Sequence, residues 1–129
     1  MDDCPFCQIA AGDADTELIA ESGHSVAFYD RYPVSDGHAL VIPRRHEVDL
    51  FDLELSERAD AWALLDSVRG LLVDRLNPDG FNIGVNANEA AGQTIDHAHI
   101  HLIPRYQGDV EDPRGGIRWV IPDRAPYWD

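Results

Sequence analysis

The chain has 129 residues and a formal net charge of −14, and all ten of its basic residues are arginine. A chain of this length predicts one domain, with a core large enough to need no disulfide staples. The acidic balance argues against general nucleic-acid binding, because such affinity depends on neutralising phosphates, and no apolar run reaches the roughly 18 residues of a membrane span.

The start of the chain and its composition bear on where the protein works. Met1-Asp2-Asp3-Cys4 is acidic and has no apolar stretch behind it. This start differs from a secretory signal, so we expect a cytoplasmic location. Two origins of the lysine-free acidic composition remain open: GC-rich coding with an ordinary acidic surface, or adaptation to high salt, which screens self-repulsion.

The first 43 residues predict a short helix and three strands. The elements are a helix that follows Cys4-Pro5-Phe6-Cys7 and stops at Gly12, a pair of strands over Glu17–Glu21 and His24–Asp30, and a third strand over His38–Ile42. Ser22-Gly23 is typical of a hairpin turn, and Arg31–Gly37 is rich in loop residues. Pro43 ends the third strand, because proline lacks the N–H that a ladder needs.

The middle of the chain predicts one long amphipathic helix. Ser56 is a residue type that caps helices, so we expect the helix to begin there. Apolar residues then recur at helical spacing, at Ala61, Leu64, Leu65, Val68, Leu71, Leu72 and Leu76. Asn77-Pro78-Asp79-Gly80 would end the helix.

The last third of the chain predicts two further strands and a tail. Strands over Phe81–Val85 and Ile95–Ile103 flank a polar loop over Asn86–Thr94, and Gly115–Pro122 suits a short edge strand. Together the elements indicate an α+β fold, with a five-stranded antiparallel sheet, one long helix and a short N-terminal helix. We expect a single domain over residues 1–129, with a core of about 4–106 and a C-terminal tail of 107–129.

The run His97-Ala98-His99-Ile100-His101-Leu102-Ile103 places three histidines at alternate positions. Period-two alternation is typical of a half-buried strand, on which alternate residues share a face. The run admits a catalytic metal site, a solvated histidine-rich face, or a histidine nucleophile with helpers. Against the metal, the first and third histidines would lie roughly 13 Å apart, at about 3.3 Å per residue.

The blocks that accompany this run resemble the histidine triad (HIT) superfamily of nucleotide hydrolases and transferases. Besides the triad, the blocks are Phe28-Tyr29-Asp30, Pro33, Gly37–Pro43, His46, Phe81-Asn82, Asn86 and Gly92-Gln93-Thr94. They stand in the order and at the spacing of the family. The resemblance extends over nearly the whole chain and implies a single HIT-like domain.

The resemblance implies catalytic roles for four histidines. His99 would be the nucleophile that attacks the α-phosphorus and forms a covalent nucleotidyl-histidine, which water then releases. The backbone carbonyl of His97 would hold the other ring nitrogen of His99. His101 would donate to phosphate oxygens, and His38 would brace the triad from the neighbouring strand.

The same resemblance places a purine nucleotide around the triad. The residues implied are Asp30 for the ribose hydroxyls, Asn86, Gln93 and Thr94 for the phosphate or leaving group, and Phe6, Ile9 and Phe28 for the base. For the three apolar residues a place in the core is an equally good interpretation, and both can hold.

Cys4 and Cys7 are the only two cysteines. A redox pair would follow a strand in a βαβ unit, and a disulfide closing so small a loop would constrain little, so half of a zinc site is favoured. In the HIT branch that carries this pair, and in the related galactose-1-phosphate uridylyltransferases, the zinc ligands correspond to Cys4, Cys7, His46 and His97. Such a closed site is structural. The alternative is a pair of buried free thiols.

The function implied is a HIT-family hydrolase or transferase that cleaves an α-phosphate bond of a purine nucleotide derivative. The leaving group is an amine, as in adenosine phosphoramidates, a second nucleotide, as in dinucleoside polyphosphates, or sulfate. The alternatives are a nucleotide-binding or interaction protein with little activity, and a hydrolase that uses zinc-bound water. No redox cofactor is expected.

The family also implies a homodimer, in which the two sheets are joined and the tail lies near the partner's site. Trp119, Tyr127 and Trp128 are the tail residues that could make this contact. His24 matches no site of the family, and we expect it to be exposed in a turn.

Overall fold

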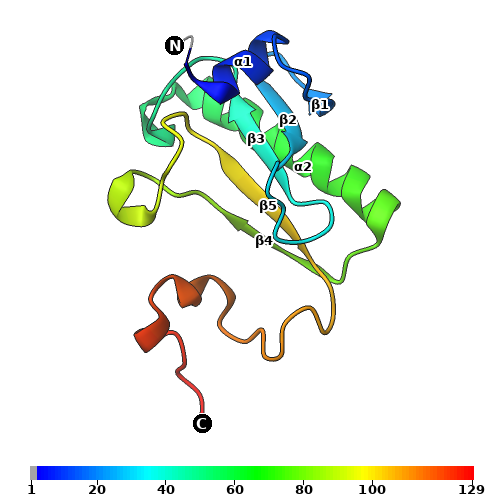
Figure 1. Cartoon of the computed structure of the whole chain (residues 1–129), viewed down its shortest axis with the longest axis vertical. Coiled ribbons are helices and arrows are strands. Elements are labelled where there is room, and N and C mark those ends of the chain that lie inside the picture. The colour runs from blue at the N-terminus through cyan, green and yellow to red at the C-terminus, as the bar shows by residue number, and fades with distance from the viewer. Residues whose placement is uncertain (1–2) are drawn as a thin grey trace.

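A five-stranded antiparallel sheet, with strand order β1-β2-β3-β5-β4, organises the fold (Figure 1). The computed structural model describes residues 3–129. Met1 and Asp2, on which the expected lack of a secretory signal partly depends, lie outside the described residues. The α+β class, the five strands, the long helix and the short N-terminal helix are all confirmed. Over residues 3–129, none of the helices is long and apolar enough to cross a membrane.

The strands and helices follow the predicted order. The strands are β1 (Leu18–Glu21), β2 (Ser25–Tyr29), β3 (Ala39–Pro43), β4 (Gly80–Gly84) and β5 (Ile100–Arg105), and the α-helices are α1 (Pro5–Ala11) and α2 (Leu55–Leu76). Four short 3-10 turns complete the fold: η1 (Leu50–Asp52), η2 (Glu89–Ala91), η3 (Gly116–Val120) and η4 (Pro122–Arg124).

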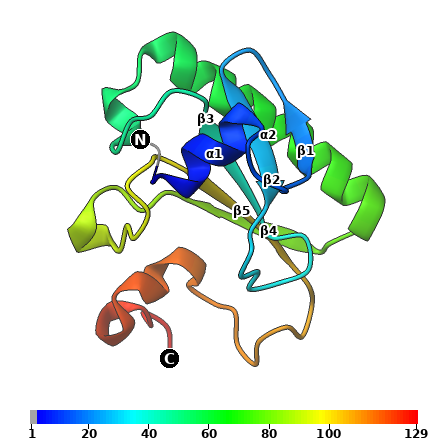
Figure 2. The same ribbon diagram turned by 45° about the horizontal axis from the view of Figure 1, so that its top comes forward.

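The two helices cover opposite faces of the sheet (Figure 2). One face packs on α2, where Val41, Ile100 and Leu102 form a core with apolar residues of the helix. The other face packs on α1, where Phe6 meets Phe28 and Leu40. Because neighbouring residues on a strand point to opposite faces, Leu40 and Val41 serve different cores. The α1 face is the one that also carries the histidines.

The predicted start of the long helix at Ser56 is wrong by two residues. Glu54 is the N-cap, and the carboxylate of Glu57 accepts the backbone N–H of Glu54 at 3.0 Å. The Glu57 carboxylate thus satisfies the backbone N–H of Glu54, and the helix begins at Leu55, so that Ser56 lies in its first turn. The predicted end is confirmed, since Asn77 closes α2 in the left-handed conformation, with φ of 48°.

The predicted strand over Ile95–Ile103 starts too early. The ladder between β3 and β5 ends at the pair Val41 and Ile100, so residues 95–99 lie outside the sheet. Pro43 would stand near the next positions of the ladder, and it has no N–H to donate. The backbone N–H of Ala98 instead donates to the carbonyl of Glu47, at 2.7 Å.

The predicted edge strand over Gly115–Pro122 is wrong, because this part of the tail forms the 3-10 turns η3 and η4. Gly115 and Gly116 have φ of 92° and 45°, a left-handed conformation that an extended strand cannot contain. The tail folds on itself, with the guanidinium of Arg114 4.6 Å from the ring of Trp128. Figure 1 shows the tail below the sheet, where η3 contacts β4 and Ile117 lies beside Gly84.

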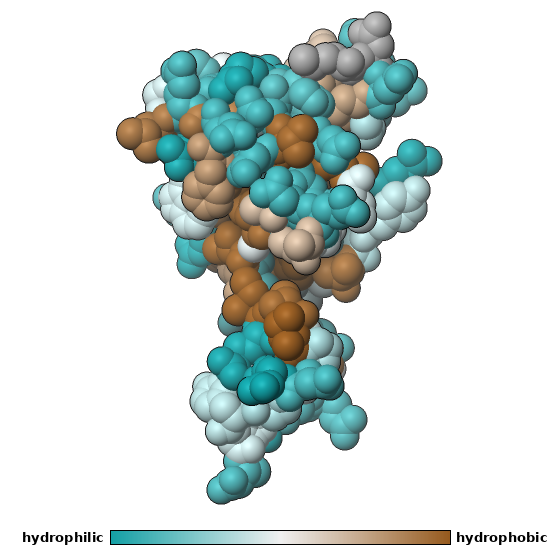
Figure 3. Space-filling model, turned by 90° about the vertical axis from the view of Figure 1, so that its left-hand side faces the viewer, coloured by the Kyte–Doolittle hydropathy of each residue, from teal (hydrophilic) through white to brown (hydrophobic). Residues whose placement is uncertain are grey.

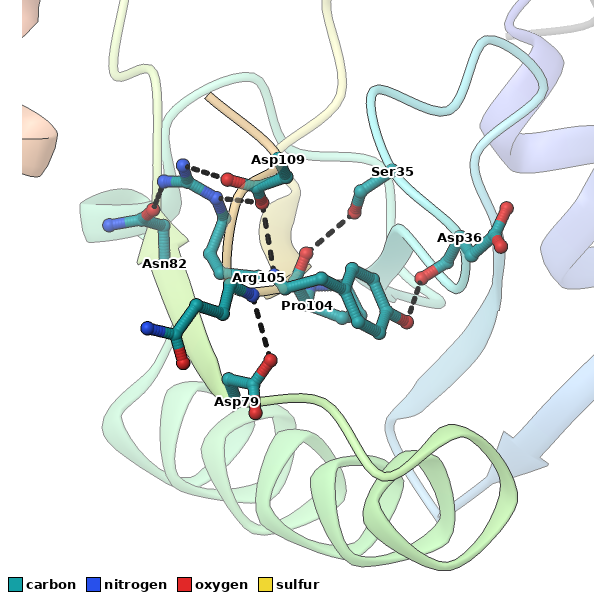
Figure 4. Close-up of polar contacts among 9 residues, drawn as sticks. Ser35, Asp36, Asp79, Asn82, Pro104, Arg105 and Asp109 are labelled. Atoms are coloured by element: carbon teal, nitrogen blue, oxygen red, sulfur yellow. Dashed lines mark hydrogen bonds and ion pairs between the residues drawn. The ribbon is translucent and has the colours of Figure 1, made fainter. Parts of the chain in front are cut away.

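The root of the tail is fixed where β5 ends (Figure 4). The guanidinium of Arg105 donates to Asn82 of β4 at 2.6 Å and to the carboxylate of Asp109 at 2.8 and 2.9 Å. The hydroxyl of Tyr106 donates to the carbonyl of Asp36 at 2.8 Å, and the N–H of Gln107 donates to Asp79 at 2.7 Å. These contacts set the direction in which the tail leaves the body.

Candidate functional site

A pocket of about 630 Å³ opens between α1, the ends of β2 and β3, and the histidine segment. Its volume is in the range of small-molecule sites. Nine of the residues predicted for catalysis or nucleotide binding line it: Phe6, Ile9, Phe28, Asp30, His38, Asn86, Thr94, His99 and His101. Phe6 and Phe28 are also members of the α1-side core, so one side chain can belong both to the core and to the pocket wall.

His99 is 7% exposed and is held in one ring orientation. Its Nδ1 lies 2.8 Å from the carbonyl oxygen of His97, so this nitrogen carries the proton and donates it. The ring of Phe6 packs edge-on against the imidazole, with 5.2 Å between centroids. In the neutral ring the lone pair therefore lies on Nε2, as a histidine nucleophile requires.

His38 and His101 form a chain with defined tautomers. The backbone N–H of Val34 donates to Nδ1 of His38 at 3.1 Å, so the neutral His38 ring carries its proton on Nε2. That Nε2 lies 2.9 Å from Nδ1 of His101, which must accept. The proton of a neutral His101 then lies on Nε2, and His101 lines the pocket as a donor.

Burial keeps both of these histidines neutral at pH 7. Desolvation, with the neighbouring His99 and His38, lowers the pKa of His101 to about 4. Desolvation also lowers the pKa of His38, although the carboxylate of Asp30 acts in the opposite direction. The histidine chain thus offers neutral hydrogen-bond donors to an anionic ligand.

Asp30 is half-buried at the end of β2 and lines the pocket. One carboxylate oxygen accepts the N–H of Tyr32 at 2.8 Å, and the other lies 3.5 Å from Nε2 of His38. Asp30, His38 and His101 are close enough to hold a metal ion. The tautomer chain argues against one, because Nε2 of His38 already carries a proton and cannot donate a lone pair.

Gln93 does not lie among the residues that line the pocket. Its amide nitrogen donates to the carbonyls of Val48 and Ile95 at 2.8 and 3.0 Å, and its amide oxygen accepts the N–H of Asn88 at 2.8 Å. These bonds brace the loop before the histidine segment. In this structure the amide of Gln93 is therefore bonded to the loop and does not point into the pocket where a phosphate would bind.

Cys4, Cys7, His46 and His97 come together beside the pocket, from three places in the chain. The sulfur of Cys7 lies 3.1 Å from Nδ1 of His46 and 3.5 Å from Nδ1 of His97, and the sulfur of Cys4 is 3.5 Å from the same Nδ1. Tetrahedral zinc with bonds of about 2.3 Å to sulfur and about 2.1 Å to nitrogen separates such ligands by about 3.6 Å. The donor set fits zinc.

A hydrogen bond on the side of the ring away from the cysteines orients His97 for this cluster. The imidazole is fully buried, and its Nε2 donates to the carbonyl of Pro43 at 2.8 Å. Nδ1 is therefore the nitrogen with the lone pair, and it is the one that faces the two sulfurs. A carbonyl that fixes the tautomer of a ligand histidine is the usual outer-shell arrangement of zinc sites.

The three histidines do not form one site. His97 faces the cysteines, whereas His99 and His101 line the pocket, and neither of the two possible metal clusters in residues 3–129 contains all three. The interpretation of the run as a three-histidine catalytic metal site is therefore not supported. His24 matches neither cluster and is exposed, as expected.

Sequence reasoning missed contributions from side chains and backbone alike. Arg31 is the one arginine among the residues that line the pocket, and its guanidinium lies 5.8 Å from the ring of Tyr32, which also lines it. Their position directly after Asp30 is the signal that could have identified them. The carbonyls of Pro43 and Glu47, which hold the histidine segment, leave no such signal.

Comparison with known proteins gives a consistent picture. Residues 11–108 match the model of the HIT domain. An uncharacterized HIT-like protein of Mycoplasma genitalium is 38% identical over 104 residues, 81% of this chain and 74% of that protein. An adenosine 5'-monophosphoramidase of Schizosaccharomyces pombe is 37% identical over 102 residues, 79% of this chain and 74% of the yeast protein. An adenylylsulfatase of Arabidopsis thaliana is 35% identical over 109 residues, 84% of this chain and 55% of the plant protein.

Solved structures agree with these matches. A HIT family protein of Bacillus anthracis superposes with a TM-score of 0.79 and 38% identity, covering 84% of this chain and 77% of that one. A zinc-bound histidine triad family protein of Mycobacterium smegmatis superposes with a TM-score of 0.79 and 37% identity, covering 86% and 81%. The zinc in the mycobacterial protein supports zinc as the metal that the cysteine and histidine cluster would hold.

Proposed function

Because the chain belongs to the HIT domain family of nucleotide hydrolases and transferases, we propose that it cleaves an α-phosphate bond of a purine nucleotide derivative through a covalent intermediate on His99. The similarity to an adenosine monophosphoramidase and to an adenylylsulfatase supports an adenylyl group as the part transferred. An amine, a second nucleotide or sulfate is the leaving group.

One observation carries this proposal. The proton of His99 is fixed on Nδ1 by the carbonyl of His97, 2.8 Å away, so in the neutral ring the lone pair lies on Nε2, the atom proposed to attack. Nε2 attacks the α-phosphorus, a P–N bond to His99 forms, and the bond to the leaving group breaks. Water then attacks the same phosphorus, the P–N bond breaks, and the nucleoside monophosphate leaves.

The neighbouring side chains are proposed to hold the nucleotide during both steps. His101 donates from Nε2 to a phosphate oxygen, where negative charge grows in the transition state, and His38 fixes the tautomer of His101. Asp30 receives the ribose hydroxyls. Asn86 and Thr94 lie in the pocket, where they can donate to the phosphate or leaving group.

The purine base and the side chain of Gln93 are the remaining parts of the proposed nucleotide site. Phe6, Ile9 and Phe28 form the apolar wall against which a purine would pack. For Gln93 we propose a bracing role in place of the phosphate contact, since its amide bonds to the loop around it.

We propose a structural zinc ion for the cluster of Cys4, Cys7, His46 and His97. Four protein ligands close the coordination sphere, so the ion would supply a cross-link between α1, the loop after β3 and the histidine segment. His97 has two functions in this scheme. Its imidazole is a ligand, and its carbonyl orients the nucleophile.

We propose that the chain acts as one domain, with a core of about 4–106 and a tail of 107–129, and that two copies associate through the tail. Val120 and Ile121 of the tail are 73% and 58% exposed. Figure 3 shows apolar side chains gathered where the tail joins the body. A second copy that covers these side chains would remove them from water.

The decisive test is turnover of a panel of adenylyl substrates by wild-type protein and by His99→Ala. Release of AMP from at least one phosphoramidate, dinucleoside polyphosphate or adenylyl sulfate, lost in the variant, supports the proposal. A protein that binds AMP with unchanged affinity in both forms, and turns over none of these substrates, would be a nucleotide-binding protein.

A further inference from the structure

The segment that carries the nucleophile is not held by the sheet. Residues 95–99 precede β5, and in this stretch the N–H of Ala98 donates to the carbonyl of Glu47 at 2.7 Å. The metal ligand His46 is the residue before Glu47. The loop after β3 therefore fixes two things at once: a ligand of the metal cluster and the backbone directly between His97 and His99.

This loop is tied in turn to the start of α2 by a bidentate ion pair. The Nε of Arg45 donates to Oε2 of Glu57 at 3.0 Å, and its Nη2 donates to Oε1 at 2.8 Å. The third guanidinium nitrogen, Nη1, donates to the carboxylate of Glu47 at 3.1 Å. Arg45 thus clamps the residues on both sides of His46.

Glu57 is a rigid anchor for this clamp. Its side chain is 10% exposed, and the same carboxylate accepts the N–H of Glu54 at the cap of α2. Hydrogen bonds from Arg45 lower the pKa of Glu57 to about 2, so the carboxylate is charged at neutral pH. A planar guanidinium matched to a fixed carboxylate leaves little freedom to the chain that carries it.

We propose that Arg45, paired with Glu57, is a positioning residue that sets the place of His46 in the metal cluster and, through the Glu47 carbonyl, the place of His99. Arg45 itself lies outside both the pocket lining and the metal cluster. Its effect is transmitted through the loop. The kinetic consequence rests on the proposed function, whereas the effect on metal binding does not.

The preceding residue offers a matched control. Arg44 also forms an ion pair, with Glu21 at 2.9 Å, and its guanidinium also donates to the carbonyl of Ser22. These contacts lead to the hairpin of β1 and β2, and none of them is made with Glu47 or Glu57. Arg44→Met and Arg45→Met therefore remove the same side chain type at neighbouring positions, and only Arg45→Met removes the clamp.

The experiment compares wild type, Arg44→Met, Arg45→Met and Arg45→Lys, each checked for folding by circular dichroism. Cobalt(II) affinity of the metal-free protein is measured by competition with a chromophoric chelator, and kcat and KM are measured for the best adenylyl substrate. For Arg45→Met we expect affinity about tenfold weaker and kcat at least about tenfold lower, at unchanged KM. Arg45→Lys should have a cobalt affinity and a kcat between those of wild type and Arg45→Met, because an ammonium cannot make the bidentate pair with both carboxylate oxygens.

Arg44→Met should stay within about twofold of wild type in cobalt affinity, kcat and KM, because an exposed ion pair contributes little. Equal cobalt affinity in Arg45→Met and wild type would overturn the proposal, and so would an equal loss in Arg44→Met. If wild type turns over no nucleotide, the proposed function fails, while the cobalt affinities still decide whether Arg45 positions the cluster.

Discussion

The carbonyl of His97 accepts the Nδ1 proton of His99 at 2.8 Å, while the imidazole of the same His97 lies 3.5 Å from the sulfurs of both Cys4 and Cys7. One residue therefore joins the possible metal cluster to the proposed nucleophile. The position of its backbone carbonyl links the cluster to the ring of His99.

The first prediction concerns the metal. If zinc is structural, removing it with a chelator should lower the melting temperature by about 15 °C, the effect expected when zinc stands about 1,000-fold above its dissociation constant. Reloading with cobalt should restore kcat to within about twofold of the zinc form. A large change of kcat, or of its pH profile, with the identity of the metal would instead indicate a metal-bound water as the nucleophile.

The second prediction concerns the nucleophile. His99→Ala should reduce kcat at least about 10³-fold, because the covalent route is lost, with little change in AMP affinity. His24→Ala is the control, since His24 is exposed outside the pocket. In wild type, rapid acid quench of a labelled adenylyl substrate should leave label on the protein, and His99→Ala should leave none.

The third prediction concerns stability against pH. Burial holds the pKa of His101 near 4 in the folded chain, against an ordinary value near 6.5 when unfolded. The unfolded state thus binds a proton first, so the contribution of His101 is fully present above pH 6.5 and is lost as the pH falls towards 4. The loss amounts to at most about 3 kcal/mol in the free energy of unfolding.

Urea unfolding of wild type and His101→Gln at several pH values between 7 and 4 measures this contribution. The free energy of unfolding should fall more steeply with decreasing pH in wild type than in the variant. Parallel curves would show that His101 has the same pKa in both states.

The fourth prediction concerns the ribose. Asp30→Asn replaces an acceptor for two hydroxyls by an amide, so KM for an adenosine substrate should rise about tenfold, the cost of one charge-assisted hydrogen bond. The preference for the ribonucleotide over its 3'-deoxy analogue should shrink by the same factor. Asp36→Asn serves as the control, because Asp36 is in the same loop but does not line the pocket.

The fifth prediction concerns the tail. Sedimentation equilibrium of the wild-type chain should give the mass of a dimer at micromolar concentration. Val120→Asp together with Ile121→Asp should shift it to the monomer, because two charges would be buried in an apolar contact. A wild-type chain that sediments as a monomer over the same range would contradict the proposed association.

The sequence alone was sufficient for the features that depend on side-chain pattern. The spacing of apolar residues predicted α2 and the sheet, and the alternation of the histidine run predicted that Ile100 and Leu102 face a core, as they do. The blocks around the run indicated the family, and the pair of cysteines indicated half of a metal site. Each of these features depends on the types of residues and on their spacing along the chain.

Tertiary structure decided the features that depend on backbone groups from distant parts of the chain. Nothing in the residues 95–99 themselves shows that their partner is the carbonyl of Glu47, since every residue offers a carbonyl and only the fold selects one. The same is true of the Pro43 carbonyl, which accepts the Nε2 proton of His97. It is also true of Glu57, which caps α2 at Glu54 and binds Arg45 of the loop before the helix. The resemblance already implied His97 for the metal cluster and His99 for the nucleotide, and the fold supplied the carbonyls of Pro43 and Glu47 that hold the segment carrying them.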